Sequence, residues 1–190
     1  MDRLLPVDRP EDVPEAWRGT PIERLLAYHN LGAPLEEHDS AEILIGMCMD
    51  NRKVLRIPDR FAFVIRAGGA NLQPAEFKVS YAVAVGGVRA LALVGHTHCG
   101  MVGLHDRRTP FVDGLVDVGW EREAAESHFD TFAPQFEIGD EVDFARSEAE
   151  RLRDRYPRLL VAPLIYRVED GRLWLIREGG SGAAGRPEGR

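Results

Sequence analysis

Apolar residues form three short runs in the first half of the chain. These runs cover residues 41–47, 61–65 and 90–94, and each ends at a group of polar residues or glycines. Short apolar runs bounded by turn residues are typical of strands that are buried on both faces of a sheet. The pattern therefore predicts three buried strands.

Four stretches carry apolar residues at helical spacing: 21–30, 74–88, 119–132 and 140–156. The second has Pro74 at a plausible first turn and two glycines near its end, and the fourth has Asp140 as an N-cap and Pro157 as a stop. The stretch at 74–88 lies between two predicted strands. A strand, a helix and a strand in this order predict a parallel crossover unit.

The last apolar runs, 159–168 and 172–176, flank Asp170-Gly171, a strong hairpin signal. The predicted fold class is therefore α/β, with a mostly parallel central sheet flanked by helices and a C-terminal hairpin at an edge. Residues 1–20 are rich in proline and charge and are expected to form an N-terminal arm, while the glycine-rich tail at 179–190 is expected to be disordered. Residues 21–178 then form a single domain.

Composition narrows the functional classes. A chain of 190 residues with 44% hydrophobic residues is long enough for one substantial core. Its net charge of -7 is spread among interspersed acidic and basic residues, which argues against nucleic acid as a partner. The charged N-terminus and the absence of an apolar run near 18 residues predict a soluble, cytoplasmic protein that does not enter a membrane.

The two cysteines follow two of the predicted strands. Cys48 comes after the first run, and Cys99 lies three residues beyond His96 at the end of the third. Open α/β sheets place their sites at the carboxyl ends of the strands, so these side chains are expected to lie close together. Two thiolates and an imidazole are three zinc ligands, which leaves a fourth position for water as in catalytic sites. Without these neighbours, two buried inert cysteines would be the better interpretation.

The residues around Cys99 and those after Cys48 also support a metal site. If a helix begins near Thr97, its N-terminus favours a thiolate at Cys99. In an extended stretch Asp50 and Arg52 face the same side as Cys48, and the guanidinium fork can hold Asp50 ionised beside the metal. The alternative is an ordinary surface ion pair worth about 0–1 kcal/mol.

Two motifs resemble the β-class carbonic anhydrases: Cys-x-Asp-x-Arg at 48–52 and Gly-His-Thr-x-Cys-Gly-Met at 95–101. Arg-Ala-Gly-Gly at 66–69 and Ser-Tyr-Ala-Val at 80–83 also match, and the similarity runs from about residue 42 to residue 104. The shortness of the chain is similar to the small prokaryotic and archaeal branch of that family.

The resemblance implies zinc held by Cys48, His96 and Cys99, with Asp50 and Arg52 as the dyad that orients a zinc-bound hydroxide. The implied activity is a lyase reaction, the reversible hydration of CO2 to bicarbonate. It also implies a homodimer or a multiple of dimers. Because two thiolates donate more charge to the metal than imidazoles do, we expect an activity that increases toward alkaline pH.

The chain departs from the family pattern beside the predicted site. The Asn expected between Arg66 and Ala67 is missing, and His98 stands where Asp is common. We expect His98 to face away from the site rather than to shuttle protons. Gly68 and Gly69 are interpreted as a turn that permits close backbone approach and contacts the substrate or the Asp50–Arg52 pair. The remaining histidines (His29, His38, His105 and His128) are expected to be solvated, and Trp120 and Trp174 to lie in the core or an interface.

Three alternatives stay open. Relatives of the same family hydrolyse carbon disulfide or carbonyl sulfide, and the same three ligands suit that chemistry. A non-catalytic zinc-binding or bicarbonate-binding paralogue is a second alternative, in which the shortened loop after Arg66 has abolished turnover. In the third, Cys48 and Cys99 form a redox pair, which predicts a disulfide and no metal.

Overall fold

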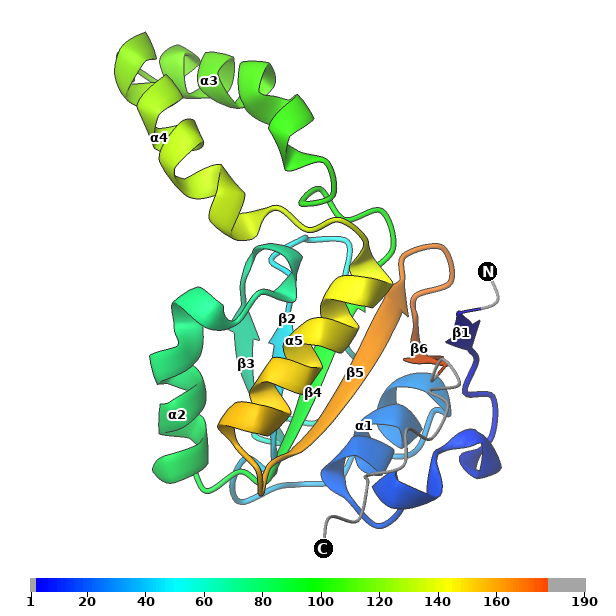
Figure 1. Ribbon diagram of the computed structural model, residues 1–190. Coiled ribbons are helices and arrows are strands. Elements are labelled where there is room, and N and C mark those ends of the chain that lie inside the picture. Colours follow the sequence, from blue (N-terminus) through cyan, green and yellow to red (C-terminus); the bar gives the residue numbers. More distant parts are fainter. Residues whose placement is uncertain (1–2, 178–190) are drawn as a thin grey trace, which may run out of the picture.

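A six-stranded sheet with the order β1-β6-β5-β4-β2-β3 forms the centre of the computed structural model, which describes residues 3–177 (Figure 1). The four strands from β5 to β3 run parallel, and β6 and β1 continue the sheet antiparallel. The predicted α/β class with a C-terminal hairpin is confirmed. The strands are β1 Leu4–Leu5, β2 Ile43–Met47, β3 Ala62–Arg66, β4 Ala90–His96, β5 Leu160–Arg167 and β6 Arg172–Ile176.

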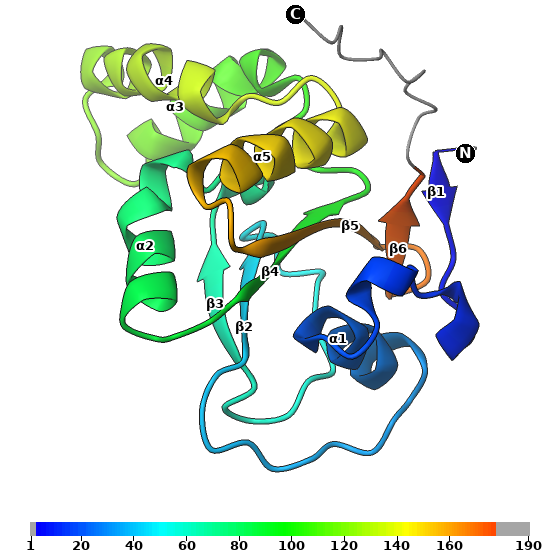
Figure 2. The ribbon, with the colours of Figure 1, turned by 60° about the horizontal axis from the view of Figure 1, so that its bottom comes forward.

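Helices cover both faces of this sheet (Figure 2). One face carries α1, and the other carries α2 and α5. The predicted cap of α5 is confirmed, because the Asp140 carboxylate accepts hydrogen bonds from the backbone N–H groups of Val142 and Asp143. The helices are α1 Pro21–Asn30, α2 Glu76–Ala84, α3 Arg108–Asp117, α4 Arg122–Phe136 and α5 Glu141–Arg155.

Strand β2 is buried on both faces, as predicted. Ile43 and Ile45 pack toward α1, whereas Leu44 packs toward α2 and α5. A Cβ atom added at Gly46 would lie 2.6 Å from the end of the Leu72 side chain, so Leu72 packs directly against the backbone of this strand.

Strand β3 differs from the prediction, because it is not buried. Within residues 3–177 it is the last strand of the sheet and pairs with β2 alone. Phe63 and Val64 are 39% and 46% exposed. An apolar run does not distinguish a central strand from an apolar edge strand, since the order of strands is set by tertiary packing.

The N-terminal residues also differ from the expected arm. Leu4 and Leu5 pair with β6, and Val7 and Val13 are fully buried in the core on the α1 side. Apolar residues spaced between prolines therefore anchor this segment to the sheet. The predicted tail at 179–190 lies outside the described residues.

Helices α3 and α4 form a hairpin that projects from the body of the protein (Figure 1). The helix predicted at 119–132 begins later, at Arg122, and continues to Phe136. Helix α3 was not predicted, although Phe111, Val112, Leu115 and Val116 lie at helical spacing; the glycine inside it, Gly114, disfavours a helix. No helix within residues 3–177 has the length and apolar character needed to cross a bilayer.

Candidate metal centre

The predicted ligands converge at the carboxyl ends of two neighbouring strands. Cys48 follows β2 directly, His96 is the last residue of β4, and the two strands pair in parallel. The ligand atoms of Cys48, His96 and Cys99 lie within 4.8 Å of one another. All three side chains are buried, at 3%, 1% and 6% exposure. The predicted convergence is confirmed.

The orientation of His96 suits a metal ligand. Its Nδ1 atom lies 2.9 Å from the backbone carbonyl oxygen of Thr97, so Nδ1 carries the proton and donates it to that oxygen. The lone pair is then on Nε2, which is buried and has no hydrogen-bond partner among residues 3–177. A ligating histidine is held in this way by a hydrogen bond from its other ring nitrogen.

The two thiols share a hydrogen bond, with 4.0 Å between the sulfur atoms of Cys48 and Cys99. This bond lowers the pKa of Cys48 and raises the pKa of Cys99, because the remaining thiol stabilises the first thiolate and opposes formation of the second. Loss of the first proton from the two thiols is therefore favoured, and loss of the second is opposed. A divalent cation would stabilise both thiolates, and two sulfurs with one imidazole nitrogen are a donor set that zinc prefers.

The segment after His96 differs from the prediction, because no helix begins near Thr97. The chain turns instead, and His98 adopts a left-handed backbone conformation with φ of 57°. Helix α3 begins only at Arg108. The N–H group of Cys99 donates to the Glu141 carboxylate at 3.1 Å. Cys99 is therefore held by a side chain of α5 and does not lie at a helix N-terminus.

Asp50 and Arg52 form a two-pronged ion pair beside the thiols. Arg52 Nη2 lies 2.7 Å from Asp50 Oδ2, and Arg52 Nε lies 3.0 Å from Asp50 Oδ1. The backbone N–H of Arg52 donates to the same carboxylate. The hydrogen bonds from Arg52 hold the pKa of Asp50 well below its usual range. The guanidinium also donates to the His98 carbonyl oxygen at 2.9 Å, so the pair is tied to the ligand loop and differs from an isolated surface ion pair.

The loop after β3 brings backbone close to the centre. Gly69 has φ of 63°, and a Cβ atom at Gly68 would lie 3.0 Å from the sulfur of Met101. The turn therefore packs closely against Met101, and its contact with the substrate stays a prediction. The Arg66 guanidinium, at the end of β3, lies 3.4 Å from the carbonyl oxygen of Cys48 and thereby braces the segment that carries the thiol.

Lys53 belongs to this region but was not predicted. Its side chain is 1% exposed, and Nζ has no hydrogen-bond partner within residues 3–177. Burial lowers the pKa of Lys53, while the nearby charges of Cys48 and Asp50 oppose that shift. A lysine directly after Arg52 in a polar cluster gives no sequence signal of burial.

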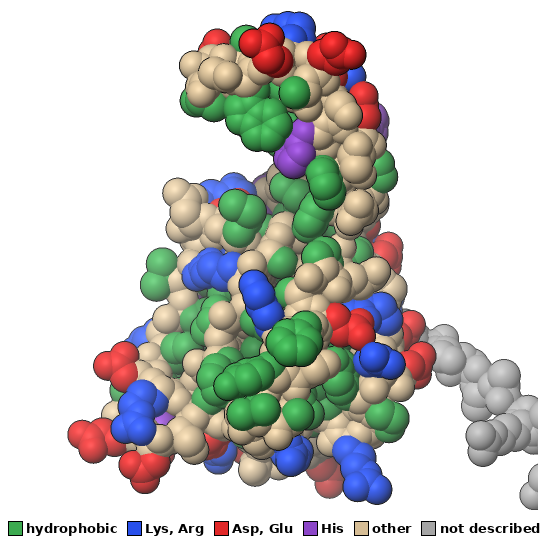
Figure 3. Space-filling model, turned by 90° about the vertical axis from the view of Figure 1, so that its left-hand side faces the viewer, with side chains coloured by type: hydrophobic (Ala, Val, Ile, Leu, Met, Phe, Trp, Pro, Cys, Tyr) green, Lys and Arg blue, Asp and Glu red, His purple; other side chains and the backbone are tan. Residues whose placement is uncertain are grey.

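An apolar groove adjoins the centre. It has a volume of about 280 Å³. Met49 and Met101, which lie close in sequence to Cys48 and Cys99, contribute to its wall. Figure 3 shows hydrophobic side chains gathered around the hollow beneath the projecting helices. The remaining lining residues are Gly68, Leu104, Phe111, His128, Phe129, Phe132, Ala133 and Phe136.

The other histidines lie outside the centre, and three of them are not solvated as expected. The His38 side chain is 6% exposed and pairs with Glu42 at 2.9 Å. His29 is partly buried with its Nε2 atom enclosed, and burial lowers its pKa. His128 is partly buried among aromatic rings of the projecting hairpin, the nearest 4.9 Å away. His105 is 70% exposed, as predicted.

His98 faces away from the ligands, also as predicted. Its Nε2 atom lies 2.8 Å from a carboxylate oxygen of Glu169, and its side chain is 70% exposed. Trp120 is 43% exposed on the projecting hairpin. Trp174 lies in β6 beneath the Arg167 guanidinium, 4.4 Å from the ring centroid. Neither tryptophan contributes to the metal centre.

Comparisons of this chain with protein-family models and with curated proteins found no match. Solved structures do match. A carbonic anhydrase from Glaciozyma antarctica superposes with a TM-score of 0.59 at 22% identity, covering 85% of this chain and 98% of that one. A β-carbonic anhydrase from Trichomonas vaginalis gives 0.60 at 18% identity, covering 77% and 90%. A carbon disulfide hydrolase in its apo form gives 0.50 at 20% identity, covering 89% and 95%.

Proposed function

We propose that this protein, which has the fold of the β-carbonic anhydrases, is a zinc lyase that catalyses the reversible hydration of CO2 to bicarbonate. One observation carries the proposal. Cys48, His96 and Cys99 meet within 4.8 Å, and the Asp50–Arg52 pair is tied to the same loop. A metal held by three ligands beside an ionised carboxylate is the arrangement of a catalytic site.

Cys48, His96 and Cys99 would hold the zinc ion. When bound, zinc would supply Lewis-acid activation that lowers the pKa of a water molecule toward ~7. Asp50 would accept a hydrogen bond from the attacking water and so orient it, because Arg52 holds its carboxylate in place and keeps it ionised. The role of Arg52 is to aim Asp50 and to prevent its protonation.

The apolar groove is the proposed approach route for the substrate. CO2 is small and has no net dipole, so a wall of methionine and phenylalanine side chains admits it without a desolvation cost. Gly68 lies in that wall, and Gly69 continues the same turn. We propose that these two glycines contact the substrate, since a side chain at Gly68 would meet Met101 in the wall of the groove.

Hydrolysis of carbon disulfide or carbonyl sulfide is the second candidate. Two observations favour it: the similarity to a carbon disulfide hydrolase and the same apolar groove, which suits these substrates as well. A comparison of CO2 hydration with sulfide release from carbon disulfide, on one zinc-loaded preparation, separates the two. A protein that binds zinc and bicarbonate but turns over neither substrate would be the non-catalytic paralogue.

We also propose that the protein forms a homodimer or a multiple of dimers. The exposed apolar side chains of β3 and α2 support this, among them Phe77 at 82% and Val64 at 46% exposure. Multi-angle light scattering of the zinc-loaded protein tests it, and a monomer at micromolar concentration would contradict it. We further propose a cytoplasmic location and a single domain over 21–178, which cell fractionation and limited proteolysis test.

A stopped-flow assay of CO2 hydration, combined with metal analysis, tests the proposed function. The proposal expects about one zinc per chain and a rate that Asp50→Asn lowers while zinc is retained. Stoichiometric zinc with no hydration above the uncatalysed rate would contradict it.

A further inference from the structure

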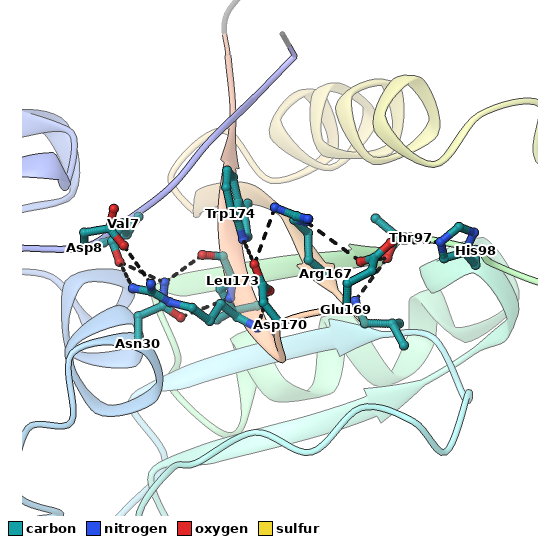
Figure 4. A network of polar contacts seen from close by, with 12 residues as sticks. Val7, Asp8, Asn30, Thr97, His98, Arg167, Glu169, Asp170, Leu173 and Trp174 are labelled. Carbon is teal, nitrogen blue, oxygen red and sulfur yellow. Dashed lines mark hydrogen bonds and ion pairs between the residues drawn. The ribbon is translucent and has the colours of Figure 1, made fainter. Parts of the chain in front are cut away.

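Glu169, in the turn between β5 and β6, contacts the ligand loop with both oxygens of its carboxylate (Figure 4). Thr97 Oγ1 donates to Oε2 at 2.8 Å, and His98 Nε2 lies 2.8 Å from Oε1. These are neighbouring residues of the loop that joins two of the metal ligands, His96 and Cys99. One side chain from a distant hairpin therefore holds two consecutive residues of the loop.

The hairpin itself is well braced. Val168 N–H donates to Thr97 Oγ1 at 3.0 Å, and Thr97 N–H donates to the Tyr166 carbonyl at 3.1 Å. Arg167 lies over the ring of Trp174, and Figure 4 shows it beside Glu169 and Asp170. The carboxylate of Glu169 is thus presented from a fixed turn.

The conformation of His98 explains why the loop needs such a contact. A residue other than glycine in the left-handed region costs about 1–2 kcal/mol, which favours relaxation to another backbone conformation. Relaxation would turn the His98 carbonyl oxygen, which now accepts a hydrogen bond from Arg52 Nη2 at 2.9 Å. The side-chain contacts of Thr97 and His98 with Glu169 oppose that change.

We propose that Glu169 is a positioning residue that holds the His98 carbonyl oxygen against Arg52 and so keeps Arg52 aligned on Asp50. The His98–Glu169 pair is exposed, at 70% and 42%, so its direct contribution to stability is small. Its effect is on geometry. The consequence for turnover rests on the proposed function of the Asp50–Arg52 pair, whereas the effect on Arg52 itself does not.

The chain offers a matched control. His105 and Glu137 form another exposed pair, also at 2.8 Å and with the histidine 70% exposed, and it does not contact the Asp50–Arg52 pair. Glu137→Ala therefore removes an equivalent surface interaction elsewhere. Any effect of Glu169→Ala that exceeds the effect of Glu137→Ala reports the specific position of Glu169.

The primary experiment measures hydrogen exchange of the Arg52 Nε–H group by ¹⁵N NMR, with the signal assigned by its loss in Arg52→Lys. Glu169→Ala should accelerate this exchange about tenfold, since opening of the guanidinium contacts becomes easier. Glu169→Gln keeps two polar atoms in place and should restore the rate to within about threefold of the wild type. Exchange that is unchanged in Glu169→Ala, or equally fast in Glu137→Ala, would overturn the proposal, as would an equal effect of Glu169→Gln.

A kinetic cycle tests the consequence for turnover. Glu169→Ala should lower kcat about tenfold or more with unchanged KM and zinc content, because a small misplacement of a catalytic pair is costly. In an Arg52→Lys background the same change should have an effect of at most about twofold. Equal losses in both backgrounds would overturn the action through Arg52. If the wild type shows no hydration, the proposed function fails while the exchange experiment still decides the role of Glu169.

Discussion

The Arg52 guanidinium forms a bidentate ion pair with the Asp50 carboxylate, with Nη2 at 2.7 Å from Oδ2 and Nε at 3.0 Å from Oδ1. The backbone N–H of Arg52 also donates to Oδ1, whereas Oδ2 accepts hydrogen bonds from the Arg52 guanidinium alone among residues 3–177 and can accept one more. The geometry joins a fixed cation to an ionised base at the edge of the metal centre. It makes Asp50 the residue through which the chemistry of this site is most easily tested.

Replacing Asp50 should remove the hydrogen-bond acceptor that orients the attacking water without disturbing the ligands. We expect Asp50→Asn to lower kcat for CO2 hydration about hundredfold, because a small misplacement of a reacting group costs a factor of this size. Since the pKa of Asp50 lies well below neutral, the loss should be similar at every pH from 6 to 9. Stopped-flow rates across that range test it. A loss that disappears at one end of the range would show that another group performs the role.

The Asp50–Arg52 ion pair should make the free energy of unfolding depend on pH in the acidic range. The folded-state pKa of Asp50 is lowered below its ordinary value of 3.8, so the pair contributes stability above that value and loses it as the pH falls through the folded-state pKa. Wild type should therefore exceed Asp50→Asn in free energy of unfolding near neutral pH, with the difference shrinking below 3.8. Urea unfolding of the metal-free proteins measures this. A difference independent of pH would argue against the ion pair.

Lys53 should destabilise the metal-free protein. Its Nζ atom is buried without a hydrogen-bond partner in the described part of the chain, and such a group costs about 1–3 kcal/mol. We expect Lys53→Met to raise the free energy of unfolding at neutral pH. The gain should shrink as the pH rises through the lowered folded-state pKa toward 10.5, because the amine then becomes neutral.

The chain supplies a control for this experiment. Its second lysine, Lys78, is exposed on α2, so Lys78→Met should change stability little. Chemical denaturation of both variants at neutral and alkaline pH makes the comparison. A destabilised Lys53→Met would instead indicate that the ammonium compensates the thiolates of the centre.

The short distance between Cys48 and Cys99 predicts sensitivity to oxidation. Their sulfurs lie 4.0 Å apart, so a movement of about 2 Å would allow a disulfide. A mild oxidant should convert the metal-free protein to an intramolecular disulfide, and zinc should prevent this by occupying both sulfurs. Thiol titration and mass spectrometry follow the reaction. Oxidation that proceeds equally fast with zinc bound would support the redox pair over the metal centre.

The sequence was most informative about the ends of buried strands. Cys48 and His96 each follow an apolar run, and parallel strands necessarily bring such ends to one edge, so the convergence was predictable. The bounds of α1 followed from apolar residues at helical spacing, and the cap of α5 followed from the aspartate at 140. These features depend on local sequence and on a rule of sheet geometry.

Features set by tertiary packing could not be predicted. The exposure of β3 depends on its position at the end of the sheet, which its own residues do not encode. The turn at His98 replaces a helix start because Glu169 and Arg52 hold it from far along the chain. The burial of Lys53 likewise follows from the path of a loop.

The central claim is tested most directly by one measurement on paired proteins: zinc content and CO2 hydration of the wild type and of Cys48→Ser. The account predicts about one zinc per chain and rapid hydration in the wild type, with both strongly reduced in Cys48→Ser because one of the three convergent ligands is weakened. A wild type that hydrates CO2 without zinc, or a Cys48→Ser variant that retains zinc and full activity, would contradict it.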